Sequence, residues 1–228
     1  MFSPQEFFDM RHCPFPDFYA GIQYVWEGIG RIGEFIRKTI QPGIDPSARI
    51  SPHAFIGDNV QIGAGTLVMH GAVILGPAII GEKVEIRTGA FLRPDVIIGS
   101  GAVLGNSCEF KNCFIHDSGE VPHFAYVGDS LLGYKAHLGA GVKISNVKLT
   151  WETVKVKGPE GVIDTGLVKF GAVLGDNTDV GCNSVLNPGS IIGKRSIVYP
   201  GASWRGVLPA RTIAKLRTNF EIVARRED

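Results

Sequence analysis

The chain has little surplus charge of either sign: among its 228 residues, 23 Lys and Arg stand against 22 Asp and Glu, a formal net charge of +1. This balance gives no reason to expect a nucleic acid or an anionic membrane as a partner. The sequence also lacks any apolar run of about 18 residues, which a membrane-spanning helix needs. Its first residues, MFSPQEFFDM, lack the basic n-region of a secretory signal. We therefore expect a cytoplasmic protein.

Cysteine is scarce, and no two of the four cysteines form a C-x-x-C pair. Their spacing fits no pattern known for zinc sites. We therefore expect free thiols in a reducing compartment and no bound metal. The four residues are Cys13, Cys108, Cys113 and Cys182.

Glycine is abundant, with 30 residues and no Gly-X-Y period, which indicates a role in turns. From Ile44 on, an aliphatic residue or phenylalanine recurs at every sixth position, and a small or β-branched residue follows four positions later. A period of six is typical of a parallel β-helix, an all-β solenoid whose short strands stack coil on coil. The recurring positions run from 44 to 110 in steps of six, then take in 132, 138 and 144, and then run from 168 to 204.

Two further segments flank the hexads. Residues 1–43 carry apolar residues at helical spacing with charged residues between them, so we expect an amphipathic helix that caps the end of the main domain. Residues 44–205 form that domain. Residues 206–228 leave the hexad rule and form a C-terminal tail that we expect to be helical. The apolar positions of the first helix are Ile22, Trp26, Ile29, Ile32, Ile36 and Ile40.

The hexads are interrupted twice. Between Phe110 and Leu132, the aliphatic residues Ile115, Val121 and Val127 each come one position early, as two single-residue deletions would produce. Residues 147–167 then alternate around a Gly-Pro-Glu-Gly turn, which predicts a hairpin arm that protrudes from the coil. Departures from a regular pattern are often functional, so we expect the functional site near these two interruptions.

Two cations, Arg93 and Lys111, are separated by the length of one coil, if three hexads make a coil. They would stack about 4.8 Å apart and repel each other, which suggests an anion such as phosphate between them. Two solvated side chains explain the spacing equally well. His123 lies in the displaced stretch, where neighbouring cations would keep its imidazole neutral and able to accept a proton. Tyr126 follows it by three positions.

At these residues the sequence resembles a family. HFAYVGDSLLGYKAHLGAG, together with Arg93-Pro94, Lys111 and Asn146, is similar to the acetyltransferase domain of bifunctional enzymes that make UDP-N-acetylglucosamine. Those enzymes carry a glucosamine-1-phosphate N-acetyltransferase beside a uridyltransferase. The arm and the KFGAVLGDNTDVGCNSVLNPG that follows resemble the archaeal-type sugar-1-phosphate versions more than the usual bacterial ones. The resemblance covers roughly residues 44–205.

The resemblance implies a left-handed parallel β-helix, assembled as a homotrimer with its active sites between subunits. It implies acetyl transfer from acetyl-CoA to the amine of glucosamine-1-phosphate or galactosamine-1-phosphate, without a metal, with His123 as general base. Substrate-binding residues would be Arg93, Lys111, Tyr126, His137, Asn146, Lys155 and Lys169, and Ala140 and Cys182 would lie against acetyl-CoA.

The sequence departs from the bacterial pattern at His137, Val147 and Cys182, which leaves the amino sugar open. The Gly-rich nucleotide loop of the uridyltransferase half is missing, so uridylyl transfer would need a separate partner. A scaffold or regulatory subunit of such a nucleotidyltransferase is the non-enzymatic alternative. A carbonic anhydrase built on the same repeat would need three histidines on one metal. His116 and His123 are the nearest pair, and their spacing of seven does not match the five of that family.

Overall fold

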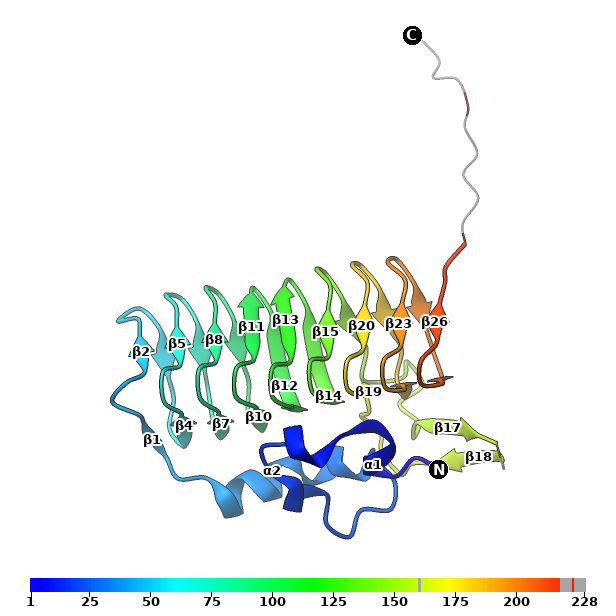
Figure 1. Ribbon diagram of the computed structural model, residues 1–228, viewed down its shortest axis with the longest axis horizontal. Helices are drawn as coiled ribbons and strands as arrows, with labels where there is room; N and C mark the ends of the chain where they lie inside the picture. Colours follow the sequence, from blue (N-terminus) through cyan, green and yellow to red (C-terminus); the bar gives the residue numbers. More distant parts are fainter. Residues whose placement is uncertain (160, 218–222, 224–228) are drawn as a thin grey trace.

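The computed structural model describes residues 1–159, 161–217 and 223, and Figure 1 shows their arrangement. The predicted parallel β-helix is confirmed: residues 43–214 wind into coils, and a complete coil contributes one short strand to each of three faces. Among the helices of these residues, none is long and apolar enough to cross a membrane.

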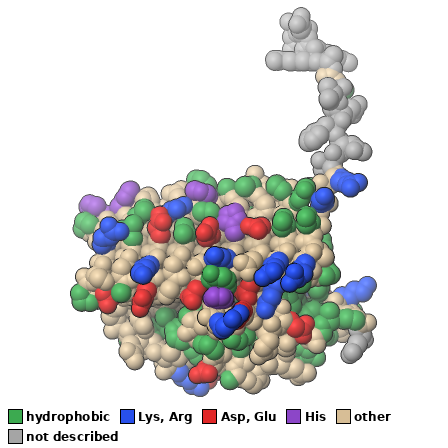
Figure 2. All heavy atoms as spheres, in the orientation of Figure 1, with side chains coloured by type: hydrophobic (Ala, Val, Ile, Leu, Met, Phe, Trp, Pro, Cys, Tyr) green, Lys and Arg blue, Asp and Glu red, His purple; other side chains and the backbone are tan. Residues whose placement is uncertain are grey.

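The first face, which we call the nine-stranded face, is a sheet of its own. Its outward residues in neighbouring coils include Glu85, Glu120, His137 and Asp179. Figure 2 shows charged and histidine side chains spread over the coil in this view. The strands are β2 (Arg49–Ile50), β5 (Leu67–Val68), β8 (Glu85–Ile86), β11 (Val103–Asn106), β13 (Glu120–His123), β15 (His137–Leu138), β20 (Asp179–Val180), β23 (Ile197–Val198) and β26 (Ile213–Ala214).

The other two faces, which we call the covered face and the third face, are fused into one 15-stranded sheet. The fusion comes from β12 (Glu109–Ile115) and β14 (Tyr126–Leu132), which run around the edge between the faces and belong to both. The covered face also holds β1 (Gly43–Ile44), β4 (Val60–Ile62), β7 (Ala78–Ile80), β10 (Val96–Ile98), β19 (Ala172–Leu174), β22 (Ser190–Ile192) and β25 (Val207–Leu208). The third face also holds β3 (Phe55–Ile56), β6 (Val73–Ile74), β9 (Phe91–Leu92), β16 (Lys143–Ile144), β21 (Val185–Leu186) and β24 (Ser203–Trp204).

The strand register explains the first interruption of the hexads. Leu92 pairs with Phe110, three full hexads further along the chain. Ile98 pairs with Ile115, and Ile115 with Leu132, and each of these steps is one position short of three hexads. One residue is therefore missing from each of two successive coils, at the edge where β12 and β14 bend.

The inward positions follow this shifted register. Ile115, Val121 and Val127 have no exposed surface, which confirms their predicted places in the core. Val168 was also expected to point inward, but it is 39% exposed because it lies at the base of the arm, before the first strand of the next coil begins at Ala172. The hexad count therefore holds within the coils and fails at the arm.

The N-terminal segment lies along one side of the β-helix and does not cap its end as the sequence led us to expect (Figure 1). Its longest helix begins at Glu27, later than the apolar pattern predicted. The physical reason for its position is that the outward residues of the covered face are apolar, namely Ile79, Ile97, Phe114, Leu131, Val173 and Ile191. The elements of the segment are α1 (Pro4–Phe7), the 3₁₀ turns η1 (Met10–His12) and η2 (Pro16–Tyr19), and α2 (Glu27–Thr39).

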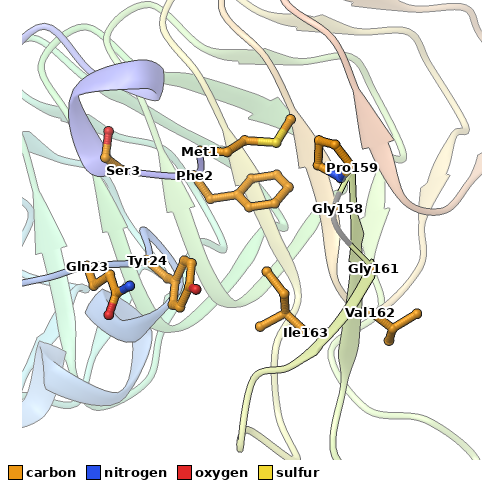
Figure 3. A pocket seen from close by; sticks show the side chains of 10 residues that line it. All are labelled: Met1, Phe2, Ser3, Gln23, Tyr24, Gly158, Pro159, Gly161, Val162 and Ile163. Carbon is orange, nitrogen blue, oxygen red and sulfur yellow. The ribbon is translucent and has the colours of Figure 1, made fainter.

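The arm is an antiparallel hairpin of β17 (Lys155–Gly158) and β18 (Gly161–Asp164), as its alternating pattern predicted. It does not stand free. Val154 and Val156 are buried in the same apolar cluster as the N-terminal segment. Phe2, Tyr24 and Ile163 line a cavity of about 510 Å³ between the hairpin and the first residues of the chain (Figure 3).

The tail that we expected to be helical instead continues the coil. β25 pairs with β22 and β26 pairs with β23, each two positions short of three full hexads, so the hexad period is broken but the strand ladder is not. The shorter turn passes through Gly206, whose φ of +97° suits glycine. Residues 218–222 and 224–228 lie outside the described residues.

Candidate active site

His123 ends β13 at the edge between the nine-stranded face and the third face. Its side chain is exposed, and its carbonyl accepts a hydrogen bond from the N–H of Gly141 at 3.0 Å. In the same way, the Ala140 carbonyl accepts from Asn183 at 2.9 Å, and the Cys182 carbonyl accepts from Gly201 at 2.8 Å. His123, Ala140 and Cys182 therefore occupy the same position in three successive coils. We call this line the His123 edge.

The third face places Tyr126 beside the next predicted residue. Tyr126 pairs with Glu109 on the neighbouring strand, and Arg93 Nη1 donates to Glu109 Oε1 at 2.8 Å. Burial raises the pKa of the Tyr126 hydroxyl, and the nearby carboxylates of Asp129 and Glu109 raise it further. Tyr126 therefore keeps its proton at neutral pH and can donate a hydrogen bond to a substrate.

Asp129 joins the remaining members of this group. Its carboxylate accepts hydrogen bonds from Asn146 Nδ2, from Asn112 Nδ2 at 2.9 Å and from Lys111 Nζ at 3.5 Å. Its side chain is only 5% exposed. Asn146 Nδ2 also lies 3.3 Å from Tyr126 Oη, so the group is continuous from Lys111 to Tyr126.

Sequence reasoning missed Asp129 as a site residue. Spacing by three full hexads does not lead to it, because this coil is one residue short and Lys111 pairs with Gly128 rather than with Asp129. Gly128 beside it leaves room for Tyr126: a Cβ there would lie 2.5 Å from Tyr126 Oη and would displace that side chain.

The structure corrects the argument that led to an anion between Arg93 and Lys111. Each cation has a carboxylate of its own: Arg93 is paired with Glu109 and Lys111 with Asp129. The two positive charges are therefore neutralised by side chains from adjacent coils, and repulsion between them no longer requires an anion. The ion pairs remove the repulsion argument, and phosphate binding by Arg93 and Lys111 stays a prediction from the resemblance.

The other predicted substrate residues divide into two groups. Lys169 forms a β-bridge with Val147 at the base of the arm, and the next residue, Phe170, donates its N–H to the Asn146 carbonyl at 2.9 Å. Lys169 is thus brought to the Asn146 end of the group. Lys155 pairs with Asp164 on the hairpin instead.

His137 lies on the nine-stranded face, where its Nδ1 is 3.4 Å from Asp179 Oδ1. Among the described contacts, none joins Lys155 or His137 to the group around Tyr126. Their assignment as substrate residues draws no support from their positions.

His116 does not form a metal-binding pair with His123. Its ring is buried against Phe8 and Phe114 under the N-terminal segment, and its Nε2 lies 2.8 Å from Tyr19 Oη. Burial lowers the pKa of His116 to about 3. Within residues 1–159, 161–217 and 223, no group of three His, Cys, Asp or Glu side chains is arranged to hold a metal ion. The four cysteines are free thiols, as expected.

Known proteins resemble this chain over the same region. Residues 74–169 match the family described as GMPPB C-terminal domain. The uncharacterized acetyltransferase YaiX of Escherichia coli O6:K15:H31 (strain 536 / UPEC) is 39% identical over 153 residues, 67% of this chain and 66% of YaiX. The chain belongs to the hexapeptide-repeat acetyltransferases. It spans slightly less than two thirds of the length of YaiX.

The chain is also similar to parts of longer proteins. It is 36% identical over 96 residues to the bifunctional sugar-1-phosphate nucleotidylyltransferase/acetyltransferase of Sulfurisphaera tokodaii, which is 42% of this chain and 24% of that protein. Among solved structures, the UDP-N-acetylglucosamine acyltransferase of Francisella novicida matches with a TM-score of 0.44 and 14% identity, over 75% of this chain and 67% of that one. A likeness at that level says nothing about the substrate of this chain.

Proposed function

We propose that this chain transfers the acetyl group of acetyl-CoA to the amine of an amino-sugar 1-phosphate, either glucosamine-1-phosphate or galactosamine-1-phosphate. The observation that supports it is the placement of the His123 edge beside the group formed by Arg93, Tyr126 and Asn146. His123 and Tyr126 are three positions apart, so their Cα atoms lie within about 10 Å of each other. A hexose phosphate is large enough to reach from one to the other.

His123 acts as the general base in this proposal. Its exposed imidazole accepts a proton from the sugar amine as the nitrogen attacks the thioester carbonyl carbon. A C–N bond forms, the C–S bond breaks, and the departing thiolate takes up a proton to leave free CoA. Among the described residues, the backbone N–H of Ala140 donates no hydrogen bond, so it is available to the negative oxygen that develops on the carbonyl.

The line of the His123 edge gives a direction for acetyl-CoA. Ala140 and Cys182 continue from His123 toward the last coils, and both positions are small or exposed. A Cβ at Gly139 would lie 2.7 Å from the Cys182 backbone nitrogen, so the coils approach closely here. We place the pantetheine chain along this edge, with the thioester at His123.

We extend the proposal to a homotrimer with the site between subunits. The N-terminal segment already occupies the covered face. Neighbouring subunits of such a trimer would therefore contact the third face and the nine-stranded face, the two that meet at the His123 edge. No separate nucleotidyltransferase is needed for the acetyl transfer itself.

The test is release of free thiol from acetyl-CoA in the presence of each sugar phosphate. We expect His123→Ala to lower kcat at least about 100-fold, since loss of a general base typically costs that much. His70→Ala is the matched control, because His70 is exposed and lies on the same edge three coils earlier. No turnover with either sugar by the native chain, or full turnover by the His123→Ala variant, contradicts the proposal.

A further inference from the structure

A charged cavity lies on a different edge of the β-helix from the His123 edge, between the nine-stranded face and the covered face. It has a volume of about 470 Å³ and forms where the N-terminal segment meets the last coils. Figure 2 shows Lys and Arg side chains gathered beside a histidine on this side of the molecule. The side chains that matter are Arg11 and His12 from the segment, and Tyr134, Lys194, Arg195 and Arg211 from the coils.

Two of these arginines are stacked by the coil. The Arg195 N–H donates to the Asp176 carbonyl at 2.9 Å, and the Arg211 N–H donates to the Lys194 carbonyl at 2.8 Å. Arg195 and Arg211 thus hold equivalent positions in adjacent coils, where backbones lie about 4.8 Å apart.

Both arginines also have left-handed backbones, with φ of +57° and +60°. That conformation costs a residue with a side chain roughly 1 kcal/mol. The equivalent corners of other coils hold Lys83, Gly101, Ser118, Lys135 and Asn177, so a cation at this corner is not by itself unusual, and what sets Arg195 and Arg211 apart is their surroundings.

The carboxylates of the cavity are already engaged. Arg11 Nη2 lies 2.5 Å from Asp9 Oδ2. The buried Asp176 accepts hydrogen bonds from the N–H groups of Asp9 at 2.6 Å and Tyr134 at 2.8 Å, and Lys194 Nζ is 3.9 Å away. Among the described residues, no salt bridge involves Arg195 or Arg211. Two guanidinium groups at this cavity thus lack a carboxylate partner in that part of the chain.

The remaining wall is aromatic. The rings of His12 and Tyr134 are stacked with centroids 3.9 Å apart, and both side chains are half-buried. Guanidinium groups bind phosphate oxygens in a bidentate manner, and a flat ring surface favours a base. We propose that this cavity binds the diphosphate of a nucleotide, at a site separate from the His123 edge.

Titration calorimetry with pyrophosphate, UDP and adenosine 3′-phosphate 5′-diphosphate tests this proposal. The variant to use is Arg195→Asn/Arg211→Asn, because asparagine tolerates the left-handed backbone. We expect it to bind at least tenfold more weakly than the native chain while unfolding at the same temperature. Lys83→Asn is the matched control: Lys83 is exposed, has a φ of +52° and lies on the same edge in an early coil.

Each outcome of the titrations either identifies the source of the ligand or contradicts the proposal. Tighter binding of adenosine 3′-phosphate 5′-diphosphate identifies the nucleotide end of CoA as the source, and tighter binding of UDP identifies a sugar nucleotide. Either result supports the site if the double variant loses it. No binding of any of the three ligands overturns the proposal, as does equal binding by the native chain and the double variant, or an equal loss in Lys83→Asn. Binding that persists in His123→Ala distinguishes this site from acetyl transfer.

Discussion

Phe114 and Phe91 occupy the same place in the hexad, each immediately before an inward aliphatic, yet their surroundings are opposite. Phe114, on the covered face, has no exposed surface, whereas Phe91, on the third face, is 36% exposed. The hexad determines which side chains point inward. Whether an outward side chain is buried depends on the N-terminal segment, which is distant from Phe114 in the sequence. The covered and open faces therefore share one repeat but differ in stability and chemistry.

The largest difference that we expect between the faces is in their response to acid. The pKa of His116 is lowered to about 3 in the folded protein, while in the unfolded chain it returns to about 6.5. The unfolded state therefore binds the proton first, and stability is lost as the pH falls from about 6.5 toward 3, by up to about 5 kcal/mol. Urea unfolding between these pH values measures the loss.

The control variant replaces both members of the buried Tyr19–His116 hydrogen bond. In Tyr19→Phe/His116→Leu, neither the titrating ring nor its hydroxyl partner remains, so we expect the curve to be flatter by most of that amount. If the double variant is as sensitive to acid as the native chain, the covered face is not its origin.

The matched phenylalanines give the next largest effect. Phe114→Ala removes a fully buried ring and should lower the free energy of unfolding by about 4 kcal/mol, whereas Phe91→Ala should cost about 1 kcal/mol. Urea unfolding at neutral pH compares the two directly. Equal losses at the two positions would show that the third face is also covered, which in solution means by another subunit.

The smallest effect concerns the edge shared by the covered and third faces. Asp129→Asn keeps the side-chain size, and asparagine accepts the backbone φ of +49° at this position. It leaves Lys111 without its carboxylate, so we expect a loss of about 2 kcal/mol. Asp179→Asn, whose carboxylate is 58% exposed beside His137, should change stability by less than about 0.5 kcal/mol. Urea unfolding measures both, and similar losses in the two variants would remove the special role of Asp129.

The sequence predicted the coil well because its inward positions are fixed by a short period. The two shortened coils could also be predicted from the sequence, because they move the inward residues Ile115, Val121 and Val127 by one position. The sequence did not lead us to expect that the N-terminal segment buries the covered face. A signal for this burial exists in the doublets Ile79-Ile80, Ile97-Ile98, Leu131-Leu132 and Ile191-Ile192. The second residue of each doublet faces the core, and the first faces the N-terminal segment.

The candidate site could be predicted only in part, because contacts between long side chains do not follow from the repeat. The resemblance, not spacing, named His123, Ala140 and Cys182 together, and the backbone register of the structure places them at equivalent positions in successive coils. Spacing did not reveal where long side chains go. Arg93 and Lys111 stack as Arg195 and Arg211 do, but the first pair meets Glu109 and Asp129, and among the described residues the second pair meets no carboxylate.

The position of the N-terminal segment also sets an order of events during synthesis. Coils of a solenoid contact mainly their neighbours and can form one after another as the chain emerges. Trp26, however, packs against the segment's own Phe2 and against Phe170, whose ring centroid is 6.4 Å away. At about 5–20 residues per second, Phe170 is made on the order of ten seconds after Trp26. The segment is made before the coils that it covers, so the packing around Trp26 is complete only after Phe170 has emerged.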